Sequence, residues 1–261
     1  MREREHIVSD QSVLTIAYST LADRISNIKS PHLEFQHNLL VLVQNPQQIP
    51  YQKPNFICRL IESDNMGVAK SRNLAIDNCD SKYLLFADDD VIFSVKAITE
   101  LIDYFETHKN CDLILTQTKD TKGNLRKKYP LNKQKLTHFN SAKAATYEIM
   151  VRTSSIREKK IRFDENFGAG VANFLGDEYI FITDLIKAKG KGVFLPITLA
   201  THPVESSGSH WGSDSDTYAR SAVFARVFGV WAPIIRIAFL LRTNRKNVGF
   251  KNFLKFVIGL K

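Results

Sequence analysis

The sequence predicts an α/β fold in which a mostly parallel, Rossmann-like central sheet is flanked by helices. Two observations carry this prediction. Short apolar runs alternate with segments of helical periodicity between residues 13 and 199, as in parallel sheets with right-handed crossovers. Several runs also end in polar residues, and ligands of open α/β sheets bind beyond the carboxyl ends of the strands. The 261 residues, 44% of them hydrophobic, suffice for one ordinary domain or two small ones.

The apolar runs and periodic segments place the elements in order. We expect strands at the short apolar runs 13–19, 39–43, 56–61, 83–87, 113–116, 147–152 and 193–199. We expect helices at the periodic segments 21–28, 68–78, 95–107 and 176–189. Asn65 lies just upstream of the second helix, where an N-cap is expected. The Lys-rich segment 120–139 breaks the alternation and is either a lid beside a site or a solvated excursion.

The stretch from Tyr83 to Phe93 is the centre of the predicted site. An apolar run leads into Asp88, Asp89 and Asp90, and a second apolar run follows them. Side chains two apart share a face of an extended chain, so Asp88 and Asp90 should point together with Asp89 opposed. Converging carboxylates need a proton or a cation between them, and Mg²⁺ suits such a pair. The alternative is a solvated acidic turn, against which the apolar flanks argue.

The net charge of +9 is unevenly distributed along the chain. Residues 219–261 contain nine of the 36 Lys and Arg residues and no Asp or Glu, so the other 27 basic residues balance the 27 acidic ones. The three cysteines are Cys58, Cys79 and Cys111, and their wide spacing suits packing roles in a reducing cytoplasm. The N-terminus lacks the apolar core of a signal peptide, and no apolar run reaches the ~18 residues of a spanning helix.

Three motifs stand in a recognisable order along the chain. The first is Asn-Met-Gly-Val-Ala-Lys-Ser-Arg-Asn at 65–73, and the second is the acid triplet at 88–90. The third begins with Phe-Gly-Ala-Gly at 167–170 and continues with Gly-Asp-Glu at 176–178 and a histidine at 202. This order resembles the family 2 inverting glycosyltransferases, which have the GT-A fold. The resemblance covers about residues 13–202 and implies a glycosyltransferase that uses a nucleotide-diphosphate sugar.

The resemblance also implies roles for individual residues. Asp88 would lie near the nucleotide ribose, and Asp90 would hold Mg²⁺ or Mn²⁺ against the diphosphate with Asp88 and His202 as further ligands. Arg72 would brace the acids or the phosphates, and Gly67 would let the backbone approach the ligand closely. The remaining predicted nucleotide contacts are Tyr18, Ser19, Asn45, Asn65 and Asp89. For Tyr18 and Ser19, ordinary strand-end packing is an equal alternative. For His202, the role of a hydrogen-bonded loop residue is the more common one for a lone histidine after a strand.

The acidic pair supplies the predicted general base. An inverting transfer needs a carboxylate that takes the proton of the acceptor hydroxyl, and the family places an acid pair here. Glu178 is the first choice for this base and Asp177 the second. The alternative is that both acids only supply favourable charge at the N-terminus of a helix.

The sequence departs from the family pattern at the second strand, which ends in Gln44-Asn45 where many family members have an acid. An amide can still bind a base or ribose, but the donor nucleotide and sugar stay open.

The basic C-terminal region is predicted to be helical and amphipathic. We expect a catalytic domain at 1–212 and a helical segment at 213–261 that contacts an anionic membrane surface, or that packs on the domain or on a second copy. The expected acceptor is a saccharide or a lipid-linked molecule in cell-surface polysaccharide or glycolipid synthesis, in the cytoplasm or at the inner face of the membrane. Rival functions are a nucleotidyltransferase, or a non-catalytic membrane-surface or nucleic-acid-binding protein. Because those binders leave the acids unexplained, we expect no nucleic-acid partner.

Overall fold

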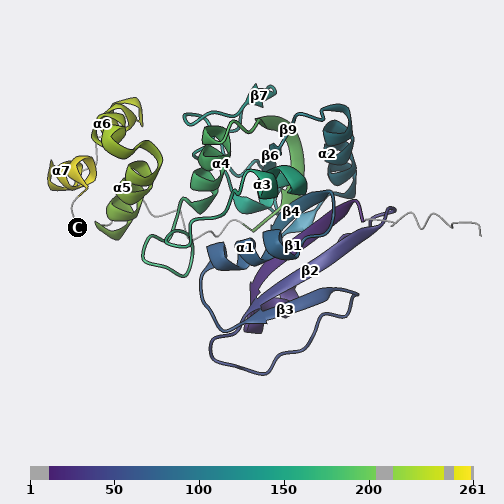
Figure 1. The fold of residues 1–261 in the computed structure, drawn as a ribbon. Coiled ribbons are helices and arrows are strands. Elements are labelled where there is room, and N and C mark those ends of the chain that lie inside the picture. Colours follow the sequence, from purple (N-terminus) through teal and green to yellow (C-terminus); the bar gives the residue numbers. More distant parts are fainter. Residues whose placement is uncertain (1–11, 204–213, 244–249, 260–261) are drawn as a thin grey trace, which may run out of the picture.

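The computed structural model describes residues 12–203, 214–243 and 250–259, which form a central sheet flanked by helices (Figure 1). The sheet has nine strands, with β7 paired to β9 outside the main order β3-β2-β1-β4-β8-β6-β9-β5. The strands are β1 (Leu14–Leu21), β2 (His37–Gln44), β3 (Arg59–Ser63), β4 (Tyr83–Asp88), β5 (Ile92–Phe93), β6 (Leu113–Lys119), β7 (Gln134–Lys135), β8 (Ile149–Arg152) and β9 (Gly192–Thr201).

The sheet is parallel where the predicted site lies. Strands β3, β2, β1 and β4 run parallel, and β6 runs parallel to β9. β8 separates these two groups because it pairs antiparallel with both β4 and β6, and the short strands β5 and β7 are antiparallel to β9. The predicted α/β fold with a mostly parallel sheet is therefore confirmed.

Helices cover both faces of the sheet and bury its alternate side chains. One face packs against α2 (Val95–Thr107) and against the 3-10 helix η1 (Ala22–Asn27). The other face packs against α1 (Val68–Asn78), α3 (Thr153–Glu158) and α4 (Asp177–Lys187). In β1, Ile16 and Tyr18 face the first group of helices while Ala17 faces the second, as the two-residue repeat of a strand requires.

Most predicted elements are present, with some differences at their ends. Helices α1 and α2 have the predicted bounds. Segment 21–28 is a 3-10 helix instead of an α-helix, and β3 begins three residues later than predicted. The N-cap of α1 is Gly67, so the prediction that Asn65 caps this helix is wrong. Segment 120–139 packs against the sheet edge through β7 and the buried Leu136.

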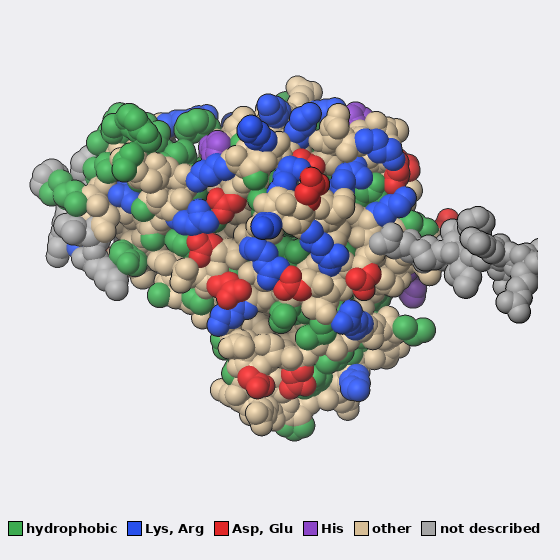
Figure 2. All heavy atoms as spheres, in the orientation of Figure 1, with side chains coloured by type: hydrophobic (Ala, Val, Ile, Leu, Met, Phe, Trp, Pro, Cys, Tyr) green, Lys and Arg blue, Asp and Glu red, His purple; other side chains and the backbone are tan. Residues whose placement is uncertain are grey.

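The C-terminal region is helical, as predicted. It forms α5 (Asp214–Phe228), the 3-10 turn η3 (Gly229–Trp231), α6 (Ala232–Thr243) and α7 (Phe250–Ile258), which pack against one another (Figure 1). α5 also packs against α4, and Figure 2 shows many apolar side chains on the surface at this end of the molecule. The predicted domain boundary at residue 212 lies outside the described residues.

The expectation that no apolar segment reaches the length of a membrane-spanning helix is wrong. The helical stretch Asp214–Arg242 is long and apolar enough, by length and composition alone, to cross a membrane. It is broken at η3, however, and α6 packs back against α5 (Figure 1). The chain therefore forms a compact helical group here instead of one straight helix.

Candidate active site

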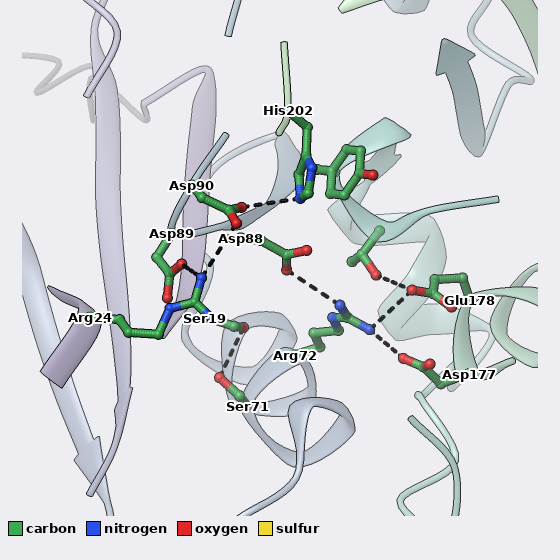
Figure 3. A network of polar contacts seen from close by, with 12 residues as sticks. Ser19, Arg24, Ser71, Arg72, Asp88, Asp89, Asp90, Asp177, Glu178 and His202 are labelled. Atoms are coloured by element: carbon green, nitrogen blue, oxygen red, sulfur yellow. Dashed lines mark hydrogen bonds and ion pairs between the residues drawn. The ribbon is translucent and has the colours of Figure 1, made fainter. Parts of the chain in front are cut away.

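A cleft of about 840 Å³ opens where the parallel strands β1 and β4 end. Ser19 of β1 lies directly opposite Asp88 of β4 in the register of the sheet. The cleft wall also includes residues from the start of α1, the N-terminus of α4 and the segments 126–128 and 142–145. The acid triplet and the acidic pair, 87 or more residues apart in the sequence, thus line one cleft (Figure 3).

The three acids of the triplet do not share one set of partners, since Arg72 lies beside Asp88 whereas Arg24 lies between Asp89 and Asp90 (Figure 3). β4 ends at Asp88, and the chain turns at Asp89 and Asp90, so strand alternation does not extend through the triplet. Asp88 faces Arg72 at 3.4 Å, whereas Asp89 is buried and accepts a hydrogen bond of 2.7 Å from Thr20. Burial raises the pKa of both Asp88 and Asp89, although neighbouring cations and hydrogen bonds oppose this effect.

Arg24 of η1 joins two of these acids. Its Nη2 lies 2.5 Å from Asp89 Oδ1 and 3.3 Å from Asp90 Oδ2. The Arg24 side chain is nearly half exposed and lines the cleft. The positive charge that the converging carboxylates require is thus partly supplied by the protein itself.

Arg72 of α1 connects the triplet to the acidic pair. Its buried guanidinium contacts Asp177, and it lies 3.5 Å from Glu178 and 3.4 Å from Asp88 (Figure 3). The group also sits over the ring of Phe163, 5.6 Å from its centroid. Burial alone would lower the pKa of Arg72, but the three carboxylates outweigh it and raise the pKa. The Arg72 guanidinium therefore contacts carboxylates on both sides of the cleft.

The two acids of the pair differ in exposure and in pKa. The Asp177 side chain is 4% exposed, and burial raises its pKa to about 7 against the opposing effect of Arg72. The Glu178 side chain is 20% exposed and accepts a 2.7 Å hydrogen bond from Thr146 Oγ1. Burial opposes ionisation of Glu178 as well, but Arg72 and Thr146 outweigh it and lower the pKa. Glu178 is thus the ionised and more accessible acid.

His202 lies against the last acid of the triplet. It follows β9, is buried, and places Nε2 at 3.1 Å from Asp90 Oδ1. This contact is the main reason that the pKa of Asp90 is lowered. The His202 ring stacks on Tyr147 with 4.5 Å between centroids, and its Nδ1 contacts Arg126 and the carbonyl of Pro203. The aromatic ring and these contacts fix the direction of Nε2.

The glycines at 67, 168 and 170 allow the loops of the cleft to approach closely. Gly67 has φ +122°, and its N–H donates to Gln44 Oε1 at 2.8 Å. A Cβ on Gly170 would come within 3.1 Å of the Gly67 backbone, and one on Gly168 would lie 2.9 Å from Asp177 Cγ. Side chains at these positions would therefore displace the loop that supports Asp177.

Three predicted nucleotide contacts do not line the cleft in the structure. Tyr18 is buried in the core, and its hydroxyl donates to the carbonyl of Lys29. Asn45 is also buried, and its side chain bonds Glu62 and the backbone of Ile49. Asn65 is exposed in the loop before α1, outside the lining of the cleft. Ser19, Arg72 and the three triplet acids do line it, and Gly67 lies between two lining residues.

Several cleft residues were not predicted from the sequence. They are mainly polar or basic and include Thr20, Arg24, Gln44, Arg126, Lys127, Lys128, Lys143 and Arg220. Gln44 was named only as a departure from the family pattern, although its position at the end of β2 indicated a cleft residue. The clustering of Lys and Arg in 120–139 was a usable signal for the basic wall. Arg24 and Arg220 belong to no sequence motif, so only the tertiary fold shows that they line the cleft.

The comparison with protein families agrees with the order of the motifs. Residues 47–161 match the family model described as Glycosyl transferase family 2. This range contains α1 with Arg72 and the acid triplet at the end of β4. This match supports a glycosyltransferase of family 2.

Individual relatives of this chain agree with the family match. It is 24% identical over 181 residues to the minor teichoic acid biosynthesis protein GgaB of Bacillus subtilis (strain 168), covering 62% of this chain. The match spans about a fifth of that relative's length, 20%. Crystal structures of S. aureus TarS 1-349 match with TM-scores of 0.59 alone and 0.61 in complex with UDP-GlcNAc, at 12% and 14% identity. These matches cover 94% and 95% of this chain and 81% and 79% of TarS 1-349. The fold is therefore of the GT-A type.

Proposed function

We propose that this glycosyltransferase moves a sugar from a nucleotide-diphosphate donor to a hydroxyl group of an anionic cell-wall acceptor, with a divalent metal and with inversion. One observation carries the proposal. The buried Arg72 guanidinium joins Asp88 at the end of β4 to Asp177 and Glu178 at the start of α4, across a single cleft. The donor-side and acceptor-side acids that such a transfer requires therefore lie within reach of one bound substrate pair.

The donor half of the cleft lies at the ends of β1, β2 and β4. Ser19, Thr20 and Gln44 offer hydroxyl and amide groups there, and Asp88 is placed to accept from a ribose hydroxyl. The TarS structures in complex with UDP-GlcNAc and with UDP support a nucleotide-sugar donor on this fold. Thermal unfolding with different nucleotides, followed by hydrolysis of the matching nucleotide sugars, would identify the donor.

Asp90 and His202 fit a divalent metal. Their facing atoms are 3.1 Å apart, which is about the separation of two neighbouring ligands that are each ~2.1 Å from an octahedral ion. Asp90 Oδ1 is buried, and apart from the facing His202 Nε2 it has no hydrogen-bond partner within the described residues. Metal binding by Nε2 would require the His202 proton on Nδ1, toward the Pro203 carbonyl, whereas the Arg126 guanidinium beside Nδ1 favours the proton on Nε2 in the metal-free site.

Water and substrate phosphates would complete such a metal site. No group of three or more His, Cys, Asp or Glu side chains placed to hold a metal is found among the residues that the structure describes. Mg²⁺ commonly takes only one or two carboxylates, with water and phosphate oxygens as its other ligands. When bound, the metal would neutralise charge on the departing nucleoside diphosphate. Mg²⁺ or Mn²⁺ is proposed here because carboxylate, water and phosphate oxygens, which would make up most of the ligand set, suit both ions.

Glu178 acts as the general base in this proposal. Its carboxylate is the more exposed of the pair, and the Thr146 hydroxyl fixes its direction. A proton acceptor on the side of the sugar opposite the leaving group supports direct displacement, and direct displacement inverts the anomeric centre. Asp177 instead holds Arg72 from its buried position and orients the guanidinium between the two halves.

The acceptor half of the cleft is basic. Lys128 and Lys143 are exposed at its rim, and Arg126, Lys127 and Arg220 line the wall beside them. Lys127 is paired with the buried Glu148, so the exposed rim lysines carry most of the attraction for a ligand. Phosphate-bearing acceptors suit such a wall, and the relative GgaB is named for teichoic acid biosynthesis.

A binding experiment tests the proposal before any acceptor is known. The thermal unfolding temperature is measured with UDP, GDP and CDP, each with and without Mn²⁺. We expect one nucleotide to stabilise the protein only when Mn²⁺ is present, because linkage raises Tm for any ligand of the native state. Asp90→Ala should abolish this response while the protein stays folded. Stabilisation that is independent of Mn²⁺, or that persists in Asp90→Ala, would contradict metal binding at Asp90.

The nucleotide that responds then directs the search for the sugar. Hydrolysis of the matching nucleotide sugars without acceptor is measured next, and turnover of one of them identifies the donor. No response to any of the three nucleotides would contradict the transferase proposal as a whole. That result would favour the alternative in which the chain acts only as a binding protein.

A further inference from the structure

The helix α6 is apolar on its solvent side as well as on its buried side, unlike an ordinary surface helix. Its buried side also carries Arg236, which is 3% exposed and donates to the carbonyls of Ser221 and Val257. Its solvent side carries Ile234, Ile237 and Leu241, which are 58%, 39% and 77% exposed. A helix on an ordinary protein surface places charge outward and apolar residues inward.

The exposed apolar residues form one continuous stripe. Val230 and Trp231 of η3 are 88% and 65% exposed, and Ile234, Ile237 and Leu241 continue from them at spacings of three and four residues. Such spacing places the side chains on one face of a helix. Leu254 and Ile258 of α7 are exposed in the same C-terminal group of helices. Figure 2 shows apolar side chains gathered at this end of the molecule.

The stripe is accompanied by positive charge only. Residues 242–261 contain six Lys and Arg residues and no Asp or Glu. Arg242 directly follows the stripe and is exposed. The two acids of α5, Asp214 and Asp216, are paired with Lys255 at 2.8 Å and with Arg220 at 2.9 Å. The partner that covers the stripe must therefore accept apolar side chains and also bring negative charge.

We propose that the stripe of Val230, Trp231, Ile234, Ile237 and Leu241 inserts into the surface of an anionic lipid bilayer. Apolar side chains with an aromatic residue enter the boundary between head groups and acyl chains, and the basic residues meet the anionic lipids. A second copy fits less well, because a self-complementary contact gains nothing from the basic composition of residues 242–261, whereas an anionic lipid surface does.

The arrangement of the helices connects this surface to the cleft. α6 and α7 pack on α5, and α5 packs on α4. Arg220 of α5 lines the cleft itself. Insertion of the stripe therefore holds the acceptor half of the cleft close to the bilayer surface. The inference does not depend on transfer activity, because it concerns binding of lipid alone.

Co-sedimentation with lipid vesicles tests the inference on the full chain. Vesicles of phosphatidylcholine with and without phosphatidylglycerol are compared at low and high salt. We expect sedimentation with the anionic vesicles only, weakened by high salt because screening reduces surface attraction. Ile234→Glu and Leu241→Glu should each lower the partition coefficient at least about tenfold, because each places a charge in the inserted stripe.

A matched control separates the stripe from general surface hydrophobicity. Ile57 is 97% exposed in the segment between β2 and β3, so Ile57→Glu makes the same substitution away from the stripe and should leave binding unchanged. The three glutamate variants should keep the wild-type Tm, because Ile57, Ile234 and Leu241 are all exposed. In Trp211→Phe, Trp231 is the only tryptophan left, and its emission should shift to shorter wavelength on anionic vesicles.

Three results would overturn the inference. The first is an absence of binding to anionic vesicles, and the second is an equal loss in Ile57→Glu and Ile234→Glu. The third is a wild-type dimer by light scattering that becomes monomeric in Ile234→Glu, because the stripe would then be an interface between two copies. Metal-dependent nucleotide binding is measured separately, so a failure here leaves the proposed transfer reaction untouched.

Discussion

Replacing Arg72 by methionine tests whether one buried cation holds the two halves of the cleft together. Arg72 is 5% exposed, and it contacts Asp177, whose side chain is 4% exposed. Methionine fills similar space but leaves the carboxylates without a counter-charge. Breaking a buried ion pair by removing one partner costs about 3 to 5 kcal/mol, so we expect Arg72→Met to lower the free energy of unfolding by that amount near neutral pH.

The loss should depend on pH in a definite direction. In the wild type, burial already raises the pKa of Asp177 to about 7. The folded state therefore binds this proton more tightly than the unfolded state, and stability falls as the pH rises from about 4 to about 7. Without Arg72 the pKa of Asp177 rises further. The variant should then be least stable in base and should recover part of its stability in acid.

Urea unfolding followed by circular dichroism, at about pH 5.5 and about pH 8.5, measures both effects. Arg162→Met is the matched control, because Arg162 pairs with Asp77 while both side chains are more than 40% exposed. Exposed pairs contribute about 0 to 1 kcal/mol, so the control should lose little at either pH. A loss in Arg72→Met that is equal at both pH values, or no larger than the control's, would refute the reasoning.

Two further predictions concern the acidic pair and the loop that supports it. Glu178→Gln should lower kcat at least about 100-fold while nucleotide affinity by calorimetry stays unchanged, because only proton transfer is lost. If Asp177→Asn does this and Glu178→Gln does not, their two roles are exchanged. Gly168→Ala should lose about 1 to 3 kcal/mol of stability, because φ is +100° and the new Cβ would lie 2.9 Å from Asp177 Cγ. Gly123→Ala shares a positive φ of +89° without any atom within 4 Å, so a comparable loss there would assign the effect to backbone strain alone.

Local patterns in the sequence were sufficient for much of the fold. α1 and α2 have the predicted bounds because apolar periodicity decides where a helix lies. The strand that ends in the acids was equally clear, since an uninterrupted apolar run suits a strand buried on both faces. The N-cap of α1 was missed because Gly67 takes φ +122° to meet the loop at Gly170, which is a tertiary requirement.

Contacts between distant segments limited the prediction of the site. The acids and Arg72 belong to motifs, so their meeting in one cleft could be expected from the resemblance. Arg24 could not be found in this way, because its role depends on η1 turning back over Asp89 and Asp90. Tyr18 and Ser19 were indistinguishable as strand-end residues, and only the pleat of β1 sends one into the core and the other into the cleft.

The contact between α4 and α5 has a consequence for any shortened form of this protein. A Cβ on Gly176, the N-cap of α4, would lie 2.5 Å from Val223 of α5. Val223 and Val227 also cover Phe167 and Ile180 in a small hydrophobic cluster beside the acidic pair. A protein cut before α5 would open this cluster to water next to Asp177. Activity lost on such truncation would therefore report damage to the first turn of α4 as much as loss of a membrane anchor.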